Sequence, residues 1–101
     1  MGGKPTYDLQ HLQQLVGQGE LSGIITKAAR EGATECGLTI PEIVQAVLML
    51  SPTDLHKTME SEKCPGTWQD VYHLRFHGTE LYIKLQLSSD GRGVVVQFKR
   101  K

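Results

Sequence analysis

The last third of the chain contains segments in which apolar and polar residues alternate, and this period of two is the strongest constraint on the fold. The clearest segment reads Leu81-Tyr82-Ile83-Lys84-Leu85-Gln86-Leu87. Alternation places every second side chain on one side of a strand, so we expect burial on a single face. Segments 67–77 and 92–100 show a similar pattern, and Gly78 and Asp90-Gly91 lie between the segments. These tight connections predict an antiparallel sheet with strands at 67–77, 80–88 and 92–100.

The residues before this sheet predict helices. Leu9, Leu12 and Val16 have the spacing of a helix, with Thr6 as its expected N-cap. A second helix is expected over about 23–36, and a third after the capping box Thr39-Ile40-Pro41-Glu42. The run 51–54 repeats that start signal, but only a short helix fits before Pro65-Gly66. We therefore expect an α+β fold with N-terminal helices packed on one face of a C-terminal antiparallel sheet.

The length and composition indicate one globular domain over residues 1–101, with residues 1–5 flexible. The chain has no apolar run of about 20 residues and no signal-peptide pattern, so no membrane partner is expected. Cys36 and Cys64 are far apart in the sequence and are typical of reduced thiols. These features predict a cytoplasmic protein.

Strand parity predicts a polar outer face without carboxylates. Its members are Gln69, His73, Arg75, Tyr82, Lys84, Gln86, Gln97, Lys99 and Lys101. Val95 is also expected on this face, while Val94, Val96 and Phe98 are expected in the core. Parity places Asp70 with the core as well, so we expect backbone or hydroxyl donors at the start of its strand to bond its carboxylate.

The chemistry of this face suits RNA, because phosphates attract cations and bases stack on aromatic rings. Residues 68–101 carry a net charge of +3 and residues 1–67 carry −3, which also favours an anionic partner for the sheet. An ordinary solvated sheet surface is the alternative interpretation. No metal cofactor is expected, since His73 and His77 on one strand would lie about 13 Å apart.

Four segments of the chain form a recognisable set of motifs. They are Leu50-Ser51-Pro52-Thr53-Asp54-Leu55-His56-Lys57-Thr58-Met59, Trp68-Gln69-Asp70-Val71-Tyr72, Leu81-Tyr82-Ile83-Lys84 and Phe98-Lys99-Arg100-Lys101. With these motifs the chain resembles the MqsR family, the motility quorum-sensing regulator mRNA interferase toxins of bacterial type II toxin–antitoxin systems. The resemblance extends from about Thr6 to Lys101. It implies a RelE-like compact ribonuclease fold and metal-independent cleavage of single-stranded mRNA at GC-containing triplets of the GCU type.

The resemblance also implies site residues and partners. The implied catalytic residues are Lys57, Gln69, Tyr82 and Lys99. The outer face and the motif around Lys57 add substrate-binding candidates, which are His56, His73, Arg75, Lys84 and Lys101. His56 stands where the family usually has Tyr, which changes base stacking at that position. The expected partners are mRNA and a cognate antitoxin, typically zinc-containing and DNA-binding.

The implied reaction is attack by the RNA 2′-hydroxyl on the adjacent phosphorus, which needs a base, charge stabilisation and an acid. Crowding of Lys57, Lys84 and Lys99 is expected to favour a neutral amine or a Tyr82 phenolate. His56 and His73 are alternative proton carriers. A non-catalytic RNA- or protein-binding module and a ribosome-dependent toxin remain alternative functions.

Overall fold

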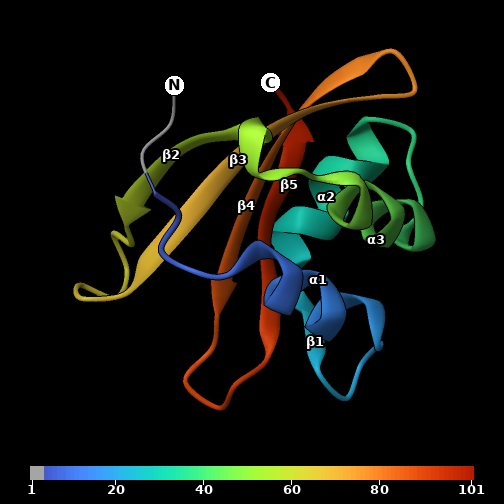
Figure 1. Ribbon diagram of the computed structural model, residues 1–101. Coiled ribbons are helices and arrows are strands. Elements are labelled where there is room, and N and C mark those ends of the chain that lie inside the picture. The colour runs from blue at the N-terminus through green and yellow to red at the C-terminus, as the bar shows by residue number, and fades with distance from the viewer. Residues whose placement is uncertain (1–3) are drawn as a thin grey trace.

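The computed structural model describes residues 4–101, so part of the expectation that residues 1–5 are flexible lies outside the described residues. The elements are α1 (Leu9–Gly17), β1 (Gly23–Ile25), α2 (Lys27–Glu35), α3 (Ile40–Met49), a 3₁₀ turn η1 (Pro52–Asp54), β2 (Leu55–Glu60), β3 (Trp68–Phe76), β4 (Thr79–Leu87) and β5 (Gly93–Arg100). The helices pack on one side of the sheet, which confirms the predicted α+β class (Figure 1).

The sheet has five strands in the order β1-β5-β4-β3-β2. Its three central strands are the predicted ones, and they pair antiparallel with tight connections. β2 adds antiparallel to the outside of β3, whereas β1 pairs parallel with β5. Figure 1 shows β2 at one edge and the helices gathered towards the other. The sequence pattern predicted the centre of the sheet and missed both edges.

The first missed strand, β1, falls inside the segment expected to be helical. It ends at Ile25, and the next residue, Thr26, still bonds β5: its backbone N–H donates to the Val95 oxygen and its hydroxyl donates to the Val96 oxygen. The same hydroxyl accepts from the Ala29 N–H and so caps α2. With three residues, β1 is too short to show a period of two in the sequence. The predicted helix over 23–36 is therefore wrong in its first turn and correct over Lys27–Glu35.

The second missed strand, β2, follows η1 directly. The predicted short helix after Ser51 is this single 3₁₀ turn. The β2–β3 pairing shifts register between Leu55 and Lys57, so His56 lies in an irregularity of the ladder. A bulge interrupts side-chain alternation, which is why β2 carries no clear strand pattern.

The helices bury a common core against the sheet. α1 begins at the N-cap Asp8 rather than at the expected Thr6, because the Asp8 carboxylate accepts from the Gln10 N–H. The predicted capping box of α3 is present, with Thr39 and Glu42 each bonding the other's backbone N–H. The core side chains include Leu12, Ile43, Val47, Tyr72, Ile83, Leu85 and Phe98. In the described residues no helix is long and apolar enough to cross a membrane.

A second register shift, between Lys84 and Leu85, corrects the predicted faces of β5. Lys84 pairs with Gln97, but Leu85 pairs with Val95, so Val96 is the extra residue of a bulge. Val95 is consequently buried in the core, and Val94 pairs with Gln86 on the outer face. The predicted side of Val95 is thus wrong, whereas Val94 is buried as expected but lies on the same side of the sheet as Gln86. Beyond the bulge, Phe98 faces inward as predicted.

Asp70 lies in the core as parity indicated, with no exposed surface. Its two carboxylate oxygens accept hydrogen bonds of 2.9 Å from the backbone N–H groups of Thr6 and Tyr7. The donors are therefore backbone groups, as expected, but they come from the N-terminal segment rather than from the start of β3. The Tyr7 hydroxyl also donates to the Trp68 oxygen at 2.7 Å. These bonds hold the segment before α1 against β3.

Candidate active site

Three strands place a row of rings and one ammonium across the outer face of the sheet. His73 on β3 is opposite Tyr82 on β4, and Tyr82 is opposite Lys99 on β5. The Lys99 ammonium lies 4.9 Å from the centre of the Tyr82 ring, and the imidazole of His73 lies 6.1 Å from it between centroids. His56 extends the row, since its ring stacks on His73 at 4.1 Å. We call these four residues the ring row.

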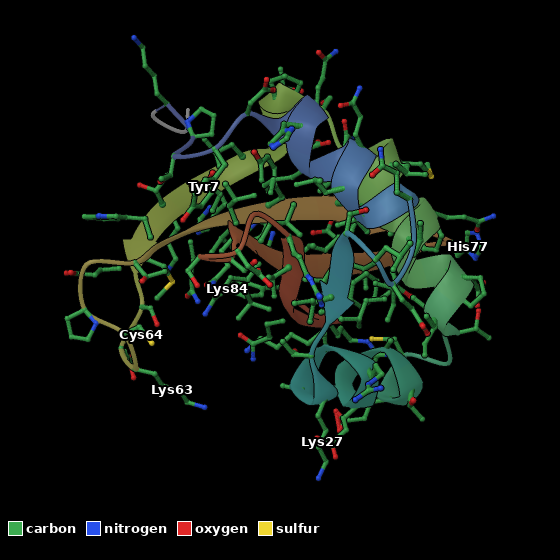
Figure 2. The ribbon with its side chains drawn as sticks, turned by 90° about the horizontal axis from the view of Figure 1, so that it is seen from below. Tyr7, Lys27, Lys63, Cys64, His77 and Lys84 are labelled. Atoms are coloured by element: carbon green, nitrogen blue, oxygen red, sulfur yellow. The ribbon has the colours of Figure 1, made fainter. Side chains whose placement is uncertain are left out.

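The neighbouring row carries two lysines. Lys57 on β2 and Lys84 on β4 lie on either side of Val71 of β3. The Lys84 ammonium is 5.8 Å from the Tyr82 ring centre, so that phenol ring lies beside two cations. Figure 2 shows Lys84 projecting from the sheet on the side opposite Tyr7 and α1. Lys57, which strand periodicity did not place, reaches the face because β2 adds to the edge of β3.

Gln69 lies in the next row. It pairs with Met59 of β2, and its Nε2 donates to the Gln86 Oε1 at 2.8 Å. Only 7% of Gln69 is exposed, so the bond fixes a nearly buried amide beside the lysines. Met59, Gln69 and Lys84 line a hollow of about 230 Å³ together with Ser61, Glu62 and Lys63 of the β2–β3 loop. The bond to Gln86 is a contact that the sequence did not predict, because it depends on cross-strand register.

The prediction of a face without carboxylates is wrong. Glu80 has the same parity as Tyr82 and lies opposite Arg75. Its carboxylate bonds the Lys101 ammonium at 3.2 Å, and its backbone oxygen accepts from the Lys101 N–H. Arg75 and Lys101 therefore lie next to the ring row, but with an acid between them. The strand pattern itself could have shown Glu80, since it is two residues before Tyr82.

On this face the pKa of Lys84 is lowered and the pKa of Tyr82 is raised. Burial, and then the charges of Lys99 and Lys57, lower the pKa of the Lys84 ammonium, while Glu62 opposes them. The crowding of lysines expected from the sequence therefore acts on Lys84. Burial raises the pKa of Tyr82, so its phenol stays protonated near neutral pH. The expected phenolate is thus not favoured, and Tyr82 is suited to donating a hydrogen bond or a proton.

His73 and His77 lie in two separate places. His73 is half-buried in the ring row, whereas the exposed His77 lies in the β3–β4 turn and stacks on Phe76. Figure 2 shows His77 near α3, well away from Lys84. Within residues 4–101, no group of three or more His, Cys, Asp or Glu side chains is arranged to hold a metal ion. The exposed Cys64 lies in the loop between β2 and β3 (Figure 2).

Comparison with known proteins identifies the family. Residues 4–100 match the family described as "Motility quorum-sensing regulator, toxin of MqsA". The chain belongs to the MqsR toxin family. It is also 30% identical over 97 residues to the mRNA interferase toxin MqsR of Escherichia coli (strain K12), an alignment that covers 96% of this chain and 95% of that protein. These matches confirm the resemblance drawn from the sequence motifs.

Proposed function

We propose that this chain is an endoribonuclease toxin that inhibits translation by cutting single-stranded mRNA in the cytoplasm. Membership of the MqsR family and the name of the Escherichia coli relative support this activity. The observation that links this activity to particular residues is the Tyr82 phenol beside the ammonium groups of Lys99 and Lys84. Two cations beside a protonated phenol form a site that can bind and neutralise a phosphate.

The proposed reaction begins with attack of a 2′-hydroxyl on the adjacent phosphorus. The 2′ proton leaves to a base, the bond from phosphorus to the 5′-oxygen breaks, and an acid protonates that oxygen. The products are a 2′,3′-cyclic phosphate and a 5′-hydroxyl, and no metal is needed. The preferred sites are GC-containing triplets of the GCU type, as the family resemblance implies.

Four residues form the proposed catalytic set. Lys57 acts as the base or as its electrostatic support, and Lys99 stabilises the charge on the phosphorane. Tyr82, whose pKa is raised by burial, donates a proton or a hydrogen bond. Gln69 positions the substrate with its amide, which the bond to Gln86 holds in place. The pKa of Lys84 is lowered, so this side chain loses its proton more readily and becomes the neutral amine that a base requires.

Incubation of the purified protein with a defined single-stranded RNA in EDTA tests this function. We expect fragments with 5′-hydroxyl and 2′,3′-cyclic phosphate ends, read by end-specific labelling and mass spectrometry. RNA that is shifted in a gel but intact indicates a non-catalytic binding module. RNA that is cut only when ribosomes translate it indicates a ribosome-dependent toxin. Either result would contradict the proposed reaction on free RNA.

An antitoxin is the proposed protein partner. The family description names its members as toxins of MqsA. We expect the cognate antitoxin to contain zinc and to bind DNA, as the family resemblance implies. Co-expression followed by purification on the toxin tests this partner, with zinc measured in the recovered complex.

A further inference from the structure

Two members of the ring row, His56 and His73, are not part of the proposed catalytic set. Their imidazoles stack with a centroid distance of 4.1 Å and an interplanar angle of 20°. His56 is exposed, whereas His73 is half-buried next to Tyr82. The register shift between Leu55 and Lys57 leaves His56 as the extra residue of a bulge, and its ring lies beside that of His73. The stack is therefore built by the fold and directly continues the proposed phosphate site.

The stack lies in a field of mostly positive charges. Lys57 follows His56 on β2, and Arg75 lies two residues after His73 on β3. Tyr82, Lys84 and Glu80 approach from β4, and Lys99 and Lys101 from β5. Asp54, the nearest preceding acid, is engaged by the Ser51 N–H at 2.8 Å. Glu80, the acid within the rows, is bonded to Lys101.

This environment disfavours charge on the His73 imidazole while the site has no anion. Burial first, then the charges of His56, Lys101 and Lys57, lower the pKa of His73 below its ordinary value of 6.5, and Glu80 opposes the shift. Two stacked imidazolium ions would also repel each other. A phosphate beside the stack would reverse this balance, since it attracts an imidazolium and accepts its hydrogen bond. The exposed ring of His56 also offers a flat surface to a nucleobase.

We propose that the stack of His56 and His73 is a proton-coupled binding site for one nucleotide of single-stranded RNA. A base stacks on His56, and the pair takes up one proton from solvent as the adjacent phosphate binds. The site rests on the proposed function, since the ligand is the RNA that Lys57, Tyr82 and Lys99 would cut. It makes RNA binding tighter as the pH falls.

The size of the effect follows from linkage. Binding raises the pKa of the pair, so the complex holds one more proton than the free protein between the two pKa values. Within that window the affinity changes by up to about tenfold per pH unit. The lower limit of the window lies below 6.5, because the pKa of free His73 is lowered. The affinity becomes independent of this pair above the pKa of the complex.

The test measures binding without cleavage. A single-stranded oligonucleotide with 2′-deoxy sugars keeps the bases and phosphates but lacks the attacking hydroxyl. Its Kd is measured by fluorescence anisotropy from pH 5.5 to 8 at constant ionic strength. For the wild-type protein we expect binding to be about fivefold tighter or more at the acidic end. A wild-type Kd that does not change with pH would overturn the proposal.

Ring-preserving variants separate the proton from the stacking surface. His56→Tyr combined with His73→Phe keeps two rings and should remove the pH dependence while retaining binding at pH 8. His56→Ala removes a ring and should weaken binding at pH 8 as well, by roughly fivefold or more. His11→Gln on α1, where His11 is exposed, is the matched histidine control and should keep the wild-type slope. An unchanged slope in the double variant would also overturn the proposal.

Failure of this proposal can be distinguished from failure of the proposed function. If the wild-type protein cuts natural RNA but binds the deoxy oligonucleotide without pH dependence, only the histidine site is wrong. If it neither cuts RNA nor binds the oligonucleotide at any pH, both are wrong. Melting curves of all variants at pH 5.5 and 8 show that each Kd refers to folded protein.

Discussion

At the scale of single residues, the proposed site depends on cations held close to a partly buried ring. The Lys99 ammonium lies 4.9 Å from the centre of the Tyr82 ring, a geometry in which a cation is attracted to the ring face. Such contacts stabilise by about 0.5–1 kcal/mol at exposed sites. The contact is therefore too weak to matter much for folding, whereas the proposed binding of a phosphate depends on the position of the charge.

Lys99→Ala should lower the cleavage rate by about 100-fold or more, because it removes a charge proposed to stabilise the phosphorane. The melting temperature should stay close to that of the wild-type protein, since Lys99 is exposed. Arg100→Ala is the matched control, because the exposed Arg100 is the next residue and points to the other side of the strand. Single-turnover cleavage of a defined RNA measures the rate of both variants. Full activity of Lys99→Ala would remove Lys99 from the site.

At the scale of elements, β5 contributes side chains both to the core and to the proposed site. Phe98 is buried in the core, and the next residue, Lys99, points to the outer face. α2 lies against the edge of β5 that β1 leaves open, so closely that a Cβ added at Gly32 would lie 1.9 Å from the Phe98 carbonyl oxygen. The glycine is thus required by backbone contact between α2 and β5. Covering this edge also protects it from pairing with another chain.

Gly32→Ala should destabilise the protein by about 1–3 kcal/mol, because α2 must move away from β5. The melting temperature should fall by roughly 4–8 °C per kcal/mol. Cleavage should also weaken at temperatures where the variant is folded, since the added carbon would clash with the backbone of Phe98, the residue directly before Lys99. Glu31→Ala, at an exposed position of the same helix, should change neither property. A Gly32→Ala variant with wild-type stability would show that this contact is not tight in solution.

At the scale of the whole molecule, hydrogen bonds to Asp70 hold the N-terminal segment against β3. The carboxylate bonds the backbone of Thr6 and Tyr7, which lie 64 and 63 residues away in the sequence. Tyr72 is fully buried on the same side of β3. Burial, and then the charges of Asp70 and Asp8, raise the pKa of Tyr72 from 10.0 to about 12. Ionisation of Tyr72 is therefore opposed by the folded state.

This shift predicts loss of stability at alkaline pH. The folded pKa lies above the unfolded value of 10.0, so the contribution is full below pH 10 and is lost as the pH rises through about 12. Tyr72→Phe cannot ionise and should lose less stability over that range. Urea unfolding at pH 8, 10 and 11.5 measures the difference. Parallel pH dependence in Tyr72→Phe and the wild-type protein would contradict the assignment.

Alternation over Leu81–Leu87 and the Asp90-Gly91 turn were enough to predict the central strands, because these signals are local. The faces of Tyr82 and Lys99 followed from the same parity. Parity gives the wrong side where the chain departs from regular strand pairing. A bulge at Val96 moved Val95 into the core, and another at His56 concealed β2. Glu80 is absent from the predicted outer face, although its spacing of two residues from Tyr82 indicates that side.

The sequence by itself determined the class of fold, the polar face of the central strands and the family, because periodicity and motifs are properties of neighbouring residues. Only the tertiary structure decided which distant residues meet on that face. Lys57 reaches it through the pairing of β2 with β3, and Gln69 is fixed by Gln86 across strands. The stack of His56 on His73 depends on a bulge. Register and bulges arise from non-local pairing, which local residue patterns do not encode.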